Sequence, residues 1–132
     1  MIQIETRDGR TAFHPGEEVE GTVRWSPVDR PPRSLEVRLF WYTEGKGGRD
    51  VGVVETLPLA DPGPEGHQPF RFRLPDGPYS FSGKIIHLLW AIEAVAEPDD
   101  HSERLAERLD IIMSPSGREI VLATEPAGAG KR

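Results

Sequence analysis

Histidine is the residue in this sequence with the widest chemical range, because it can ligate a metal or act as a general base near neutral pH. The four histidines occupy positions 14, 67, 87 and 101. None of them forms an H-x-x-x-H or H-x-H pair, and His14 and His67 stand beside proline or glycine in expected turns. Cysteine is absent, which excludes Cys-ligated metals, disulfides and thiol nucleophiles. The sequence therefore predicts no metal site and no cofactor.

Two of the histidines have more than one interpretation. His101 follows Asp99 and Asp100, which leaves a loop metal site open, although a solvated loop is favoured. His87 lies on the second face of the most apolar segment of the chain. A hydrogen-bonded, partly buried histidine is favoured there over a catalytic one.

Nucleophile and phosphate-binding motifs are missing. There is no G-x-S-x-G, and the candidate serines lie in turn-like surroundings: Ser80, Ser82, Ser114 and Ser116. The run from Gly45 to Gly48 lacks the spacing of a P-loop and is read as a hairpin loop. The adjacent acidic pairs Glu17-Glu18 and Asp99-Asp100 would point to opposite faces of a strand. We expect no catalytic residues and no enzyme; a hydrolase has only the isolated histidines in its favour.

Length and charge set the class of protein. The chain has 132 residues, with 16 Lys plus Arg against 22 Asp plus Glu and a formal charge of −6. This length suits one domain with an ordinary core, and net acidity argues against a nucleic-acid surface. The amino terminus alternates apolar and polar residues without a signal-peptide stretch, and the most apolar run is too short to cross a membrane. A soluble, cytoplasmic protein is expected.

The elements that must position any site are strands, because apolar residues recur at every second position. The clearest sets are Val19, Val23 and Trp25; Leu35, Val37, Leu39 and Trp41; Phe70, Phe72 and Leu74; and Ile86, Leu88, Trp90, Ile92 and Ala94. Glycine- and proline-rich turns separate them. The pattern predicts an all-β fold, an antiparallel two-sheet β-sandwich of about eight strands.

The boundaries of this sandwich follow from the same pattern. One domain is expected over residues 1–124, with a flexible tail over 125–132. The set from 86 to 94 has apolar residues on both faces and predicts a central strand. The segment from Asp99 to Leu109 fits either a short helix or a strand, and a strand beginning near Arg104 is favoured.

Two motifs together resemble arrestin-like domains. The first is Pro15-Gly16-Glu17 followed by Val19, Gly21 and Val23. The second runs through Phe70-x-Phe72-x-Leu74-Pro75, Pro78-x-Ser80-Phe81-x-Gly83 and Leu88-x-Trp90-x-Ile92-x-Ala94. The resemblance implies a single immunoglobulin-like, arrestin-type sandwich, of the kind found in a stand-alone prokaryotic relative. It also implies a noncatalytic adaptor that binds other proteins, whereas receptor binding and phosphate sensing do not carry over.

The aromatic residues suggest where such binding would occur. If Trp41 points inward with Leu39, then Arg38, Phe40 and Tyr42 point outward. They would line a contact face with another protein or a second copy, unless a loop over 58–69 or a neighbouring strand covers them. The predicted function is a noncatalytic protein-interaction module of adaptor or scaffold type. The alternative is a carbohydrate- or small-ligand-binding module, against which the inward parity of all three tryptophans counts.

Overall fold

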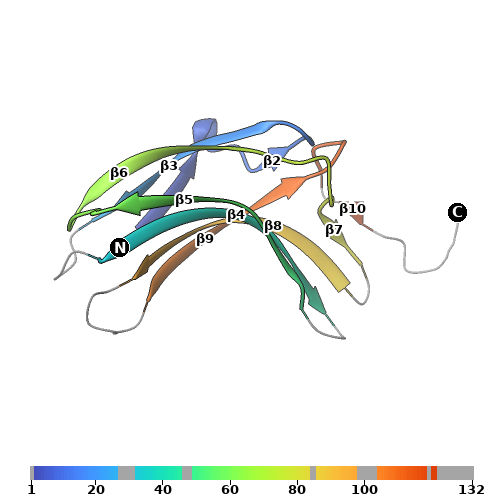
Figure 1. Ribbon diagram of the computed structural model, residues 1–132. Coiled ribbons are helices and arrows are strands. Elements are labelled where there is room, and N and C mark those ends of the chain that lie inside the picture. The colour runs from blue at the N-terminus through green and yellow to red at the C-terminus, as the bar shows by residue number, and fades with distance from the viewer. Residues whose placement is uncertain are drawn as a thin grey trace, which may run out of the picture.

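The segments in which apolar residues recur at every second position form strands of two packed β-sheets in the computed structural model (Figure 1). The structure describes residues 2–26, 32–45, 49–83, 86–97, 104–118 and 120–121. Its elements are β1 (Ile2–Thr6), η1 (Arg7–Gly9), β2 (Ala12–Phe13), β3 (Glu18–Trp25), β4 (Ser34–Gly45), β5 (Val51–Ala60), β6 (Gly66–Arg73), β7 (Phe81–Ser82), β8 (Ile86–Glu97), β9 (Leu105–Met113) and β10 (Ile120–Val121). The predicted all-β sandwich is confirmed.

The sheets differ in size. The small sheet has the order β1-β3-β6 and is antiparallel throughout. The large sheet has the order β10-β7-β8-β4-β5; β9 also pairs with β8, on the same side as β7, and β2 lies beside β9. Only the two-residue strands β2 and β10 pair in parallel among the described strands. The single domain over 1–124 stays a prediction, and the expected tail over 125–132 lies outside the described residues.

The core lies between the inner faces of the sheets. In the small sheet the alternating residues Val19, Val23, Phe70 and Phe72 are buried. In the large sheet the register sets Val37 opposite Ala94 and Leu39 opposite Ile92, and all four side chains are fully buried. Strand alternation thus places one face of each sheet in the core, and burial of these apolar side chains is the main stabilising contribution.

Strand β8 is central, as the sequence predicts. It pairs with β4 along one side and with β9 and β7 along the other. Ala91 and Val95 point away from the core, yet both are buried. The favoured strand near Arg104 is also confirmed, because β9 begins at Leu105. Asp99, Asp100 and His101 lie outside the described residues.

The tryptophans pack toward the core. Trp25 and Trp90 are buried, and their indole N–H groups donate to the carbonyls of Pro62 (3.0 Å) and Pro78 (2.7 Å). Trp41 is partly buried and packs against the core. Its indole lies so close to Gly52 of β5 that a Cβ there would come within 2.3 Å of it. A sugar-binding platform of exposed tryptophans gains no support from this arrangement.

Candidate functional site

The first motif of the family resemblance forms a turn. His14, Pro15, Gly16 and Glu17 make a tight turn in which the Glu17 N–H donates to the His14 carbonyl at 3.1 Å. Gly16 has φ +80°, and proline precedes it, which is the pattern of a type II turn. The Gly16 N–H donates to the Leu74 carbonyl, and the Leu74 N–H donates to the Glu17 carbonyl. The motif therefore ties the start of β3 to the end of β6.

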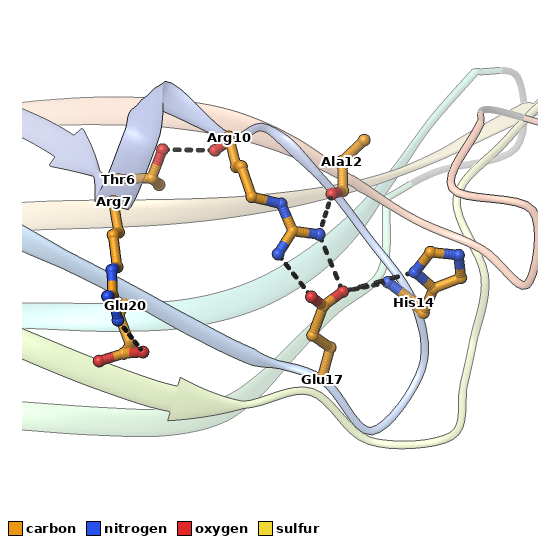
Figure 2. A network of polar contacts seen from close by, with 7 residues as sticks. All are labelled: Thr6, Arg7, Arg10, Ala12, His14, Glu17 and Glu20. Atoms are coloured by element: carbon orange, nitrogen blue, oxygen red, sulfur yellow. Dashed lines mark hydrogen bonds and ion pairs between the residues drawn. The ribbon is translucent and has the colours of Figure 1, made fainter.

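The Glu17 carboxylate is the centre of a polar network beside this turn (Figure 2). It accepts hydrogen bonds from the Arg10 guanidinium, at 3.0 Å for one pair of atoms, and from the His14 N–H at 2.9 Å. These bonds lower the pKa of Glu17 to about 2, chiefly through Arg10. Arg10 also donates to the Ala12 carbonyl and lies 4.6 Å from the centre of the Phe13 ring. These hydrogen bonds join Glu17 to residues 10 and 14, and Arg10 to residue 12, and so fix the backbone of the turn. The motif therefore has a structural role.

The second motif is structural for a similar reason. Ser80 is buried, and its hydroxyl accepts a hydrogen bond from the Met113 N–H at 2.9 Å. The Ser80 N–H donates to the Met113 carbonyl at 2.8 Å. The segment before β7 is thereby fixed to the end of β9, on the large sheet. Neither motif is a candidate binding site.

The histidine at position 87 is hydrogen-bonded and partly buried, as predicted, with Nδ1 2.9 Å from the Ser82 Oγ. His14 Nδ1 lies 3.5 Å from Glu17, within the turn network. Among the residues that the structure describes, no three histidine or acidic side chains cluster as a metal site would require. The expectation of no metal and no cofactor stays a prediction, because the Asp99 to His101 segment is outside the described part.

The outer face of the large sheet brings the predicted contact residues together. Arg38, Phe40 and Tyr42 alternate along β4, and the rings of Phe40 and Tyr42 stack with centroids 5.7 Å apart. Phe40 is partly buried, while Tyr42 is only 4% exposed. The Arg108 guanidinium from β9 lies 5.0 Å from the centre of the Tyr42 ring. Burial raises the pKa of Tyr42, and the negative charge of Asp110 raises this pKa further.

A neighbouring strand accounts for this burial, whereas the expected loop over 58–69 does not exist. Residues 58–60 belong to β5 and residues 66–69 to β6, with a short turn between the two sheets. That part of the prediction is wrong because Pro58 is accommodated at the edge of the sheet, where its missing N–H breaks no interior ladder. Tyr42 is therefore a covered residue, and its exposed neighbours form the surface.

The exposed part of the surface lies on β5, which the sequence analysis missed. Val53 is opposite Phe40 and Val51 is opposite Tyr42, on the same outer face. Their exposed fractions are 55% and 56%. The register shifts between Leu39 and Phe40, so Val54 is an extra residue in the strand. The shared parity of Val51 and Val53 was a signal in the sequence, but only the pairing register places them beside the aromatics.

The aromatics and valines surround a shallow hollow. Its volume is about 250 Å³, and its lining residues are Arg38, Phe40, Tyr42, Arg49, Val51, Val53, Glu93 and Arg108. We call this the β5 hollow. Its apolar floor and arginine-rich rim match the residue types that carry binding energy at protein interfaces.

The outer face of the small sheet has a different character. Glu5 pairs with Arg24 at 3.2 Å, and Glu20 lies between Arg7 (3.4 Å) and Arg71 (3.5 Å). A wide groove of about 710 Å³ runs past these residues toward Leu57 of β5 and the stacked Phe70 and Phe72 of β6. Its charged side chains largely satisfy one another, as on an ordinary solvated face.

Comparison with known proteins adds information on the fold. No protein-family model and no curated protein matches the chain. By its fold the chain is a two-sheet β-sandwich protein, and similarity to a solved structure supports an arrestin-like fold. A solved structure of that kind is Spo0M, the sporulation control protein of Bacillus subtilis, with a TM-score of 0.61 and 21% identity. The match covers 85% of this chain and 48% of Spo0M, so the chain spans about half of that protein's length. No described helix is long and apolar enough to cross a membrane.

Proposed function

We propose that this chain is a noncatalytic protein-interaction module, of adaptor or scaffold type, that binds another protein through the outer face of its large sheet. The observation that carries the proposal is the β5 hollow, where two exposed valines adjoin stacked aromatics on a solvent-facing strand pair. Likeness to Spo0M, a sporulation control protein, is consistent with a regulatory or interaction role. The two motifs of the resemblance hold turns and strand ends together, and the proposal therefore rests on the hollow.

The burial of Tyr42 decides how the surface is tested. Replacing Tyr42 would disturb packing as well as contact, whereas Val51 and Val53 are exposed and can be changed without opening the core. Threonine has the shape of valine and is a good strand former, so the variant Val51→Thr/Val53→Thr should keep its fold. Leu105→Thr is the matched control, because Leu105 is also an exposed apolar strand residue, at the start of β9.

Affinity capture from the native cell with mass spectrometry provides the measurement. A partner retained by the original chain and by Leu105→Thr, but reduced about tenfold with the double variant, is the expected result. An identical set of proteins captured by all three versions would contradict the proposal. Far-UV circular dichroism of each version checks that the comparison is between folded proteins.

A further inference from the structure

The edge of the large sheet beside the β5 hollow is open. Strand β5 pairs with β4, and no strand among the described residues pairs with its other side. An unpaired edge presents backbone N–H and C=O groups that can pair with an added strand. Pro58 weakens the second half of this edge, because it lacks an N–H. The stretch from Val51 to Val54 contains neither proline nor charge and is the accessible part.

An added strand along this stretch would reach both parts of the hollow. Val51 and Val53 face outward beside the edge, next to Phe40 and Tyr42 on β4. Side chains of a neighbouring strand alternate between faces, so every second side chain of the added segment would lie over the outer face. Those side chains would cover the two valines and stand beside the arginine rim.

The arginines that line the β5 hollow indicate which charge a bound segment would carry. Three arginines and one glutamate line the hollow, in a chain whose net charge is −6. Arg38 is engaged by Glu36 at 3.2 Å and lies 3.9 Å from Glu93, and Arg108 pairs with Asp110 at 3.2 Å. Arg49 is exposed and forms no hydrogen bond or ion pair with any other described residue. Arg49 is therefore the arginine of this rim that has no carboxylate partner among the described residues, and it favours a partner that supplies one.

We propose that the β5 hollow binds an extended, acidic segment of a partner protein, which pairs with the edge of β5 over residues 51–54 and places a carboxylate against Arg49. This inference rests on the proposed function and names the chemistry of the partner. A carboxylate would form charge-assisted hydrogen bonds with the Arg49 guanidinium, while the apolar side chains of the segment cover Val51 and Val53.

The experiment titrates the whole chain with a fluorescent peptide of about ten residues, in which one set of alternate positions carries Glu at one end and Val along the rest, and the other set carries Thr. A second peptide carries Lys in place of Glu. The acidic peptide should bind more tightly than the basic one, with an affinity that falls as salt is raised. Arg49→Gln should weaken binding about fivefold, Arg49→Lys should restore most of it, and Arg24→Gln on the opposite face should change nothing. Amide-resolved spectra should shift over residues 49–55.

Three results would overturn the inference: equal affinity for the acidic and basic peptides, no effect of Arg49→Gln, or peptide-induced shifts confined to the small sheet. Binding to phosphatidylserine vesicles without binding to the acidic peptide would assign the arginines to a lipid surface and would also overturn it. Loss of captured protein in Val51→Thr/Val53→Thr alongside any of these results would leave the proposed function standing, so the two failures are distinguishable.

Discussion

The outer faces of the two sheets differ in the residues that they present to solvent. Both faces consist of strand residues that alternate with buried core residues. On the small sheet these residues are Glu and Arg side chains that pair across strands, such as Glu5 with Arg24. On the large sheet the equivalent positions hold stacked aromatics and exposed valines. Strand alternation therefore determines which residues face outward, whereas their chemistry distinguishes the charged face of the small sheet from the partly apolar face for which we propose binding.

The largest loss of stability is expected from a substitution at Gly21, on the small sheet. A Cβ at this position would lie 2.2 Å from the Glu5 carbonyl oxygen and 2.6 Å from the Phe70 ring. Because the first clash is with the backbone of β1, Gly21→Ala should lower the free energy of unfolding by about 3 kcal/mol in urea titrations. A loss below about 1 kcal/mol would show that β1 can move away easily. Such a result would contradict the close packing of the small sheet.

A smaller effect is expected at Gly52, on the edge of the large sheet. Here the three nearest atoms all belong to the partly exposed Trp41 indole, a side chain that can shift more easily than backbone can. Gly52→Ala should cost about 1–2 kcal/mol and shift part of the tryptophan emission to the red. Unchanged emission with unchanged stability would show that the indole does not lie against this strand.

The turn beside the small sheet depends on charge, which makes its stability pH-dependent. The folded pKa of Glu17, about 2, lies below the ordinary value of about 4.3, so its stabilising effect is present above pH 4.3 and is lost as pH falls toward 2. Glu17 is partly exposed, which limits the effect of Glu17→Gln at pH 7 to about 1 kcal/mol. In urea titrations the difference between the two proteins should be complete at pH 7 and should shrink as the pH falls from about 4 toward 2. A difference at pH 2 as large as at pH 7 would refute this assignment.

The smallest effect is expected at Arg24, in the salt-bridge network of the small sheet. Its side chain is 54% exposed, so Arg24→Gln should change stability by less than about 0.5 kcal/mol. Capture of a partner should also be unaffected. Loss of capture in this variant, measured beside Leu105→Thr, would move the binding face to the small sheet.

Much of this architecture could be predicted from the sequence. The alternation around Trp90 predicted a central strand, and the strand favoured near Arg104 over a short helix is β9, which begins at Leu105. Arg38, Phe40 and Tyr42 were correctly grouped on one face. What could not be predicted was the contribution of β5 and β9 to that face, because strand register depends on pairing between distant segments. Val53 and Arg108 therefore had no visible relation to Phe40 until the fold was known.

Hydrogen exchange of the chain, with and without a partner identified by capture, shows which sheet a partner covers. We expect slower exchange over residues 49–55, at and beside the β5 edge, on binding, with smaller protection over β4. Exchange over β3 and β6 should stay unchanged. Protection confined to β3 and β6, with residues 49–55 exchanging as in the free chain, would contradict the assignment of binding to the large sheet.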